Sequence, residues 1–313
     1  MHSLSRWNSR LSVYLAALAL LVPALLVSGC STSPRPSPTS GEKTLSIVAS
    51  FYPVYLDVLQ LTKDIPGVDV TLLVPPSTGC LHDYALTGGD MKTLTGADVL
   101  VVNGGGMEGF LTQLATDFPR LVVIESSRGI VPVLDPLGAT DPHVWTSPKS
   151  ASVQLSNIAQ DLAAADPVHA ALYSANATRY GEALAALDRR AETLLAPYAG
   201  THVLAGHSSF LYFARDYGFD VIGLFGLDDG QTVGTGELSR MIDAAKALPG
   251  SLIVSDPQYP AIAGETVARE TGLQACVFDS VAGGTLEGSA ALDDYLDRMN
   301  ANLDRLVKTL EAR

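Results

Sequence analysis

The stretch Val168–Pro197, VHAALYSANATRYGEALAALDRRAETLLAP, decides how this chain is organised. It is rich in Ala and Leu, it contains a single glycine, and its apolar residues recur at helical spacing. A helix of about thirty residues rises on the order of 45 Å, which is enough to cross a whole domain. Asp166-Pro167 separates it from a second predicted helix at Ser150–Ala165. The sequence therefore predicts a long helix that joins two parts of the molecule.

Short apolar segments alternate with helix-like segments on both sides of this helix. Such alternation predicts α/β layers with mostly parallel strands. We therefore expect an α/β fold with two lobes, the first formed by residues 44–166 and the second by residues 199–313, joined by a linking helix at residues 167–198. The segments predicted as strands are 44–50, 68–75, 99–104 and 121–126 in the first lobe, and 201–206, 219–226, 251–257 and 273–279 in the second.

The length, the net charge and the fraction of charged residues exclude some classes of protein. A length of 313 residues suits one large or two medium domains. The chain has 20 Lys and Arg against 33 Asp and Glu, a formal net charge of −13, so we expect no nucleic-acid partner, which would require a basic face. With only 17% charged residues, the chain is not a disordered acidic tail either.

The first thirty residues have the order of an export signal. Arg6 and Arg10 precede an apolar run at residues 13–27, and Ser28-Gly29-Cys30 follows. The alternative, a membrane span, requires about 20 apolar residues, whereas Pro23 and Ser28 interrupt this run. The ending resembles a bacterial lipobox, so we expect residues 1–29 to be a lipoprotein signal peptide and Cys30 to carry the lipid. An ordinary secretory signal with an incidental cysteine is the alternative.

Residues 30–43 are rich in Ser, Pro and Thr and are predicted to be a flexible tether. The expected location is therefore outside the cytoplasm, with the protein lipid-anchored to the outer face of the bacterial cell membrane or in the periplasm. Cys80 and Cys276 lie in different halves of the chain, and we expect two separate thiols rather than a disulfide.

Three histidines and one aspartate are candidate metal ligands. His82, His143 and His207 lie in loops or at strand-to-helix junctions, and Asp279 ends the last predicted strand. In parallel α/β sheets a ligand crevice forms outside the carboxyl ends of the strands, so these side chains can converge. Three imidazoles and one carboxylate suit a tetrahedral zinc site. The alternative is that local hydrogen bonds satisfy each histidine, since the wide spacing is a weak signal by itself.

Five segments carry a resemblance to a known family: His82-Asp83-Tyr84, Asp141-Pro142-His143-Val144-Trp145, Gly206-His207-Ser208-Ser209-Phe210, Asp256-Pro257-Gln258-Tyr259 and Asp279-Ser280. On these segments the chain, from about residue 45 to the C-terminus, resembles the zinc- and manganese-binding solute-binding lipoproteins of ABC importers. The resemblance implies two lobes joined by one rigid helix, with the metal in the interlobe cleft as cargo rather than as the cofactor of an enzyme. It also implies a monomer that meets a membrane permease and its ATPase.

In this family the resemblance assigns His82 and His143 to the first lobe and His207 and Asp279 to the second. Zinc-importing members often carry a histidine-rich loop before the second motif, and residues 125–141 contain no histidine. Manganese members tend to have glutamate at the position of His207, and a third imidazole favours zinc. We therefore expect Zn²⁺, with Mn²⁺ as the alternative. Cys80 and Cys276 flank ligand segments, and we expect both to be small core residues; an additional soft-metal or redox feature is the alternative.

Two other functions are compatible with parts of the sequence. A zinc-dependent hydrolase would need an open coordination position and a general base such as Asp83 or Asp141, although a carboxylate beside a ligand histidine more often orients it. A dinucleotide-binding oxidoreductase is suggested by the GxGxxG pattern at Gly104–Gly109, with Glu125 ending the next strand. In a dinucleotide-binding fold this pattern follows the first strand, whereas these glycines follow the third predicted strand of the lobe.

Overall fold

The computed structural model describes residues 44–81, 84–135, 138–224, 234–259 and 262–313. The predicted signal peptide, the predicted tether, the predicted lipidation residue Cys30 and the predicted ligand His82 lie outside these residues. Lys43–Arg313 form one compact unit, so the boundaries at 166 and 198 remain predictions. No helix among the described residues has the length and apolar character needed to cross a membrane.

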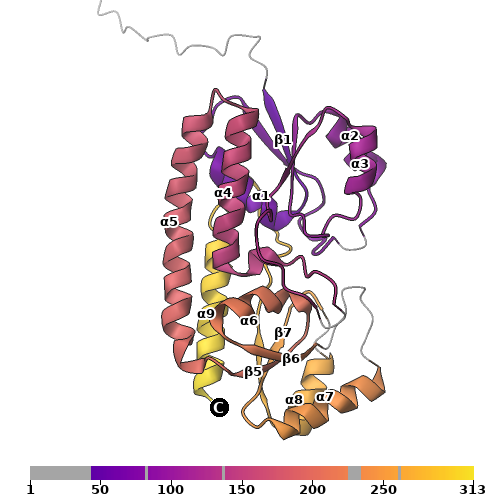
Figure 1. The fold of residues 1–313 in the computed structure, drawn as a ribbon, viewed down its shortest axis with the longest axis vertical. Helices are drawn as coiled ribbons and strands as arrows, with labels where there is room; N and C mark the ends of the chain where they lie inside the picture. The colour runs from indigo at the N-terminus through magenta and orange to yellow at the C-terminus, as the bar shows by residue number, and fades with distance from the viewer. Residues whose placement is uncertain (1–43, 82–83, 136–137, 225–233, 260–261) are drawn as a thin grey trace, which may run out of the picture. The chain divides into compact units, whose positions relative to one another are not determined.

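The first sheet is fully parallel, with the strand order β2-β1-β3-β4 (Figure 1). The central strand β3, VLVV, is buried along its whole length, as expected for a strand covered on both faces. Its elements are β1 (Leu45–Ala49), α1 (Tyr52–Thr62), β2 (Val68–Leu72), α2 (Gly88–Thr95), β3 (Val99–Val102), α3 (Leu111–Asp117) and β4 (Val122–Glu125).

The second sheet repeats this winding, with the order β6-β5-β7-β8 and all strands parallel. Four predicted strands in each half are therefore confirmed. Its elements are β5 (His202–Ala205), the 3-10 helix η3 (Ser208–Phe210), α6 (Leu211–Tyr217), β6 (Asp220–Leu224), α7 (Thr235–Ala247), β7 (Leu252–Ser255), α8 (Ile262–Thr271) and β8 (Gln274–Val277).

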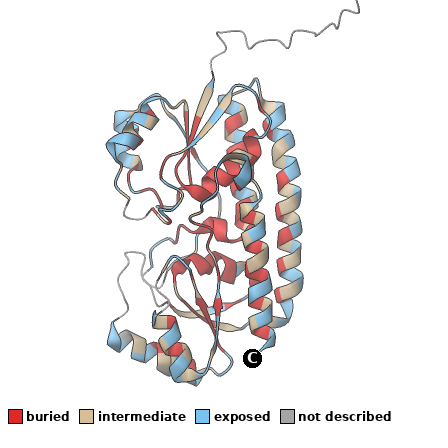
Figure 2. Ribbon diagram, turned by 180° about the vertical axis from the view of Figure 1, so that it is seen from behind, coloured by how far each residue is buried: buried red, intermediate tan, exposed pale blue. Residues whose placement is uncertain are grey.

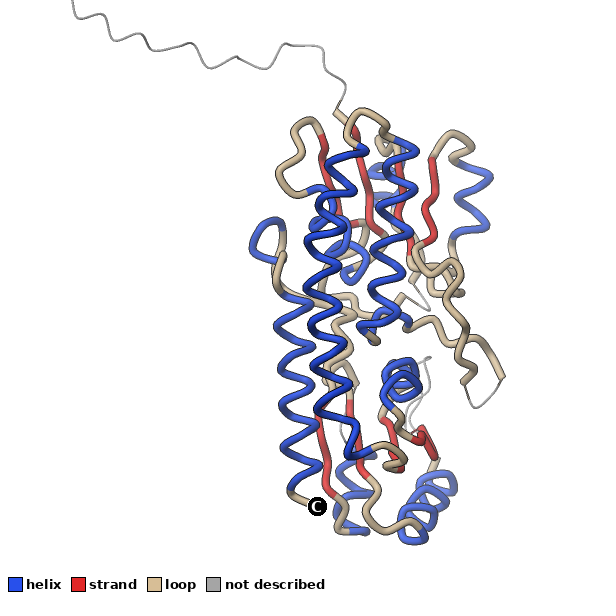
Figure 3. Tube along the Cα trace, turned by 60° about the vertical axis from the view of Figure 1, so that its left-hand side comes forward, coloured by secondary structure: helices blue, strands red, loops and turns tan. Residues whose placement is uncertain are grey.

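Three long helices connect the halves: α4 (Pro148–Ala165), α5 (Ala170–Leu195) and α9 (Asp294–Glu311). α4 and α5 pack side by side after the chain reverses at Asp166-Pro167 (Figures 1 and 3). α5 contacts α1 from the first half and α6 from the second, and α9 contacts α1, α5 and β8. The predicted long helix is confirmed, and the 3-10 helix η2 (Ala196–Tyr198) follows it directly.

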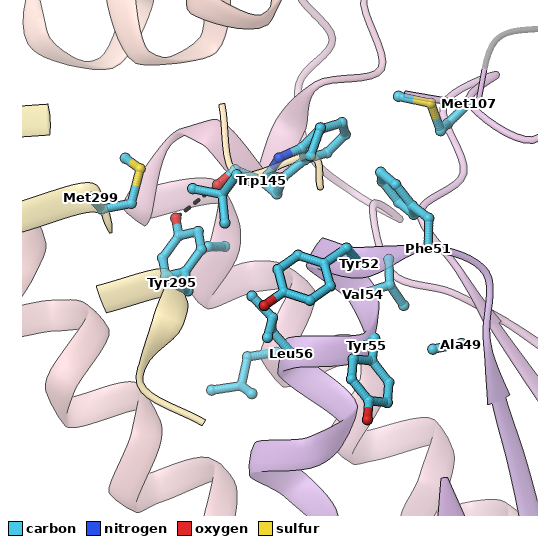
Figure 4. Close-up of a cluster of buried hydrophobic side chains, with 14 of the residues drawn as sticks. Ala49, Phe51, Tyr52, Val54, Tyr55, Leu56, Met107, Trp145, Tyr295 and Met299 are labelled. Atoms are coloured by element: carbon cyan, nitrogen blue, oxygen red, sulfur yellow. Dashed lines mark hydrogen bonds between the residues drawn. The ribbon is translucent and has the colours of Figure 1, made fainter. Parts of the chain in front are cut away.

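One hydrophobic core runs through both halves, and a smaller one lies under α7 and α8 (Figure 2). Trp145, in the 3-10 helix η1 (Val144–Thr146), lies at the junction of the halves (Figure 4). Its indole Nε1 donates to Ser280 O at 2.7 Å, its carbonyl accepts from Tyr295 Oη at 2.7 Å, and its ring meets Phe51 edge-on at 5.0 Å. The segment that follows the first sheet is thus held by residues from the second half.

Candidate metal centre

His143 is held in place by Asp141. Both side chains are buried, in the loop between β4 and α4. The Asp141 carboxylate accepts a hydrogen bond from the His143 backbone amide at 2.9 Å and lies 3.1 Å from the ring Nδ1. Tyr212 of α6 donates its hydroxyl proton to Asp141 O at 2.9 Å. A carboxylate on one ring nitrogen orients the other, Nε2, as is typical of metal-ligating histidines.

His207 follows β5 through Gly206 and is also buried. The side chain that any other residue would have at 206 would crowd strand β7, since a Cβ there would lie 3.2 Å from Ser255 Cα. The His207 ring stacks on Tyr259 at 4.3 Å between centroids, and the Ser209 amide donates to its Nδ1 at 3.2 Å. A metal bound at Nε2 requires the ring proton on Nδ1, so that amide contact would have to be given up.

The structure brings His143 and His207 together. Their ring centroids lie 4.7 Å apart, with an interplanar angle of 80°, and Ser208 Oγ lies 3.2 Å from His143 Nδ1. The first histidine follows the first sheet and the second follows β5, so the carboxyl-terminal ends of the two sheets meet here. The expected convergence is therefore observed for this pair.

Asp279 is the second residue after β8, and Arg298 of α9 binds its carboxylate. Arg298 Nε donates to Asp279 Oδ2 at 2.9 Å, and Nη2 donates to the other oxygen. Val281 N also donates to Oδ1 at 2.9 Å. Arg298 could not be found from the sequence, because only the tertiary fold places this helix residue beside the strand end.

Cys80 contacts the other ring nitrogen of His143: its Sγ is 3.4 Å from Nε2. The preceding Gly79 has φ +77°, and a Cβ there would lie 2.2 Å from Gln258 Oε1, so the loop that carries Cys80 packs tightly on the second half. Cys80 and Cys276 are both free thiols, as expected. Among the described residues no group of three or more His, Cys, Asp and Glu is arranged to hold a metal ion.

Burial and two neighbouring groups act in opposite directions on the pKa of His143. Burial lowers the pKa of the His143 imidazole, but the neighbouring Asp141 carboxylate and Cys80 sulfur raise it, and the net result is a pKa well above the ordinary value of 6.5. A divalent ion at Nε2 would compete directly with this proton, because only the neutral imidazole is a ligand.

The glycine-rich turn does not present its amides to a ligand. Gly104, Gly105 and Gly106 all have positive φ. The buried carboxylate of Glu108 accepts from the amides of Asn103 at 2.8 Å and Gly104 at 3.0 Å, and from Ser50 Oγ at 2.7 Å. In a dinucleotide site such amides would face a pyrophosphate. An internal side chain occupies them here, which argues against the oxidoreductase.

Comparisons with known proteins agree with this geometry. The family model described as zinc-uptake complex component A, periplasmic, matches residues 47–309. The manganese-binding lipoprotein MntA of Halalkalibacterium halodurans is 30% identical over 301 residues, which cover 94% of this chain and 97% of that protein. The high-affinity zinc uptake system protein ZnuA of Bacillus subtilis is 28% identical over 303 residues, covering 91% and 94%.

A solved structure gives the same fold. The solute-binding protein FpvC of Pseudomonas aeruginosa in complex with Mn²⁺ matches with a TM-score of 0.76 at 26% identity, covering 86% of this chain and 99% of that one. The two-lobed α/β architecture with its long helix is therefore that of a known group of metal-binding proteins.

Proposed function

The chain belongs to the family of periplasmic zinc-uptake components, solute-binding proteins of metal importers, and we propose that it captures one divalent transition metal ion as cargo. Zn²⁺ is the preferred ion and Mn²⁺ the alternative. The proposed donors are His82, His143 and His207, with Asp279 as the fourth predicted ligand. The single observation that carries the proposal is the contact between the two buried histidine rings, 4.7 Å apart, from opposite halves of the chain.

Binding at this place links the halves of the molecule. One ring follows the first sheet and the other follows β5, so an ion that joins them adds a bond between segments 64 residues apart in the sequence. Because the ion binds the folded site and not the unfolded chain, it should stabilise the fold by mass action.

The preference for zinc follows from the donors. Imidazole nitrogen suits Zn²⁺, whereas Mn²⁺ is better served by oxygen ligands. The printed names of the relatives include both a manganese-binding and a zinc-uptake protein, so the family alone does not choose the metal.

We propose that no chemical reaction accompanies capture. Asp141, one candidate base for a hydrolase, already holds His143 through the ring nitrogen and the backbone amide. A catalytic zinc would need an open position for water beside a base that can accept a proton. An orienting carboxylate instead fits a site whose task is to hold the ion.

The proposed partners are an ABC permease and its ATPase, to which the protein would deliver the ion as a monomer. Export by the signal peptide and lipid attachment at Cys30 would keep it at the outer face of the cell membrane or in the periplasm. The lipobox-like ending of residues 26–30 supports this location, and the manganese-binding relative is itself named a lipoprotein.

Metal analysis and a competitive titration of Zn²⁺ against Mn²⁺ test the proposal. We expect one ion per chain, tighter binding of Zn²⁺, and a rise in Tm on its addition. His143→Ala and His207→Ala should each abolish these effects. His169→Ala is the matched control, because His169 pairs with Asp166 within the turn between α4 and α5. Equal binding by all three variants would refute the site.

A further inference from the structure

Residues 280–293 cross from the second half of the chain to the first. The segment leaves the second sheet after β8 and returns on α9, yet its backbone amides bond to the first half. Gly284 N donates to Pro76 O, in the loop after β2, at 2.8 Å. Gly288 N donates to Tyr55 Oη of α1 at 2.9 Å. This segment, called the strap below, therefore ties the two halves together.

Little apolar surface holds the strap on the first half. Residues 283–290, GGTLEGSA, include no buried residue, and Leu286 is exposed. Gly284 approaches α1 so closely that a Cβ there would lie 2.2 Å from the Tyr52 ring. The contact thus consists of backbone and hydroxyl groups rather than of packed apolar side chains. Water can replace such hydrogen bonds, and segments with few buried apolar contacts open locally without global unfolding.

Val281 begins the strap in a strained backbone conformation. Its φ is +60°, and among the residues that the structure describes it is the one β-branched residue with a positive φ. This conformation costs free energy and persists only where the surroundings enforce it. Val281 N donates to Asp279 Oδ1 at 2.9 Å, and the preceding carbonyl, Ser280 O, accepts from Trp145 Nε1 at 2.7 Å. The backbone at Val281 can relax once these contacts weaken.

Arg298 joins the two ends of the strap. Its Nε donates to Asp279 Oδ2, just before the strap, at 2.9 Å, and its Nη1 donates to Asp294 Oδ2, just after it, at 3.1 Å. Nη1 also donates to Gly283 O at 2.6 Å. Tyr52 of α1 donates its hydroxyl proton to Asp294 at 2.9 Å. Because charge-assisted bonds are stronger than neutral ones, this arginine is the main lock on the segment.

We propose that the strap is a conformational switch in which Arg298 locks the segment on the first half and Val281 is the hinge on which it swings when the lock opens. The ion pairs of Arg298 favour the docked form, and relief of the strained φ at Val281 favours the released form. The balance of these two terms sets how often the strap is released. Release moves Ser280 away from Trp145 and loosens the join between the halves. The motion itself needs no metal; only its use as an entry path for the ion rests on the proposed function.

Hydrogen exchange of the metal-free chain, with a chelator present, tests the lock. The probes are the amides of Gly284 and Gly288, which bond to the first half. In the wild type they should exchange through a local opening that low concentrations of urea do not accelerate. Amides of the buried strand β3 should instead exchange through urea-dependent global unfolding. Arg298→Met should accelerate exchange of the two probes about 10-fold or more, because hydrogen bonds to charged groups are lost.

Lys308→Met is the matched control, since Lys308 lies exposed on the same helix, and it should exchange as the wild type. Tyr52→Phe is a milder variant that removes only the hydroxyl bound to Asp294, and it should accelerate the same two amides by a smaller factor. The inference is overturned if these amides in the wild type depend on urea as those of β3 do, or if neither variant changes their rates. Both results leave the metal proposal intact, because no metal is present. A chain that shows the local opening but binds neither Zn²⁺ nor Mn²⁺ refutes the proposed function and keeps the switch.

Discussion

Asp57 is expected to make the folded state less stable as pH rises. This residue lies on α1, in a buried position where α1 packs on α5 and α9. Burial raises the pKa of its carboxyl from 3.8 to about 8. Tyr180 of α5 and Tyr295 of α9 lie near enough that burial and then the Asp57 charge raise the pKa values of both phenols.

The sign of the effect follows from proton counting. Between about pH 4 and pH 8 the folded chain keeps the Asp57 proton and the unfolded chain releases it, so the free energy of unfolding falls as pH rises. The slope is about 1.4 kcal/mol per pH unit, which amounts to roughly 3 kcal/mol between pH 5 and pH 7 and roughly 6 kcal/mol over the whole window. Above about pH 8 both states are ionised, and the slope ends.

Asp57→Asn removes this proton. Urea unfolding of the wild type and the variant, with a chelator present to exclude metal effects, should give two stability curves whose difference is constant below about pH 4 and changes by about 1.4 kcal/mol per pH unit between about pH 4 and pH 8. Asp117→Asn, at an exposed position on α3, is the matched control and should run parallel to the wild type. Parallel curves for Asp57→Asn and the wild type from pH 5 to pH 8 would refute the reasoning.

Four further expectations concern the metal centre and its support. Asp141→Asn should lower Zn²⁺ affinity about 10- to 100-fold by calorimetry, and an unchanged affinity would argue against its orienting role. Trp145 is the one tryptophan among the described residues, with its ring centroid 5.2 Å from that of His143; in the chain without residues 1–29 its fluorescence should change on Zn²⁺ addition, and a flat titration would count against binding there. Because the pKa of His143 is raised, protons should begin to compete with Zn²⁺ for its ring while the pH is still above 6.5. The apparent Zn²⁺ affinity, measured by chelator competition, should therefore already decrease as the pH is lowered toward 6.5. A decrease seen only below pH 6.5 would contradict the raised pKa. Glu108→Gln should cost roughly 1–3 kcal/mol in urea unfolding, since one of the two buried oxygens that accept these amides becomes an NH2 group that cannot accept, and an unaltered midpoint would show that the lost bond contributes little.

The repeating pattern of the sequence predicted most of the fold. Eight apolar runs became eight parallel strands. An inner strand such as β3 is buried along its whole length, so it is apolar throughout and stands out from the intervening segments. The helix α2 was not predicted, since its first two residues, Gly88 and Gly89, are poor helix formers. The signal that could have revealed it is the capping box formed by Thr87 and Asp90.

At the candidate site, contacts between residues close in the sequence could be predicted, whereas contacts between residues far apart could not. The pairing of Asp141 with His143 joins residues two apart, so the sequence could suggest it. The partner of Asp279 is 19 residues away on another element, and the sulfur of Cys80 meets a ring 63 residues away. Only the packing of α9 and of the loop after β2 determines those neighbours, so they could not be predicted from spacing.

The burial of the two histidine rings, 0% and 1% exposed, should also govern how fast an ion can enter and leave the proposed site. An ion in solution has no direct path to a ring that water does not reach, so loading must wait for a transient separation of the covering segments. The observed association rate should then reach a plateau as the concentration of free ion increases, and the plateau measures the frequency of that separation. Retention time is limited by the same motion, whichever donors hold the ion once it is inside.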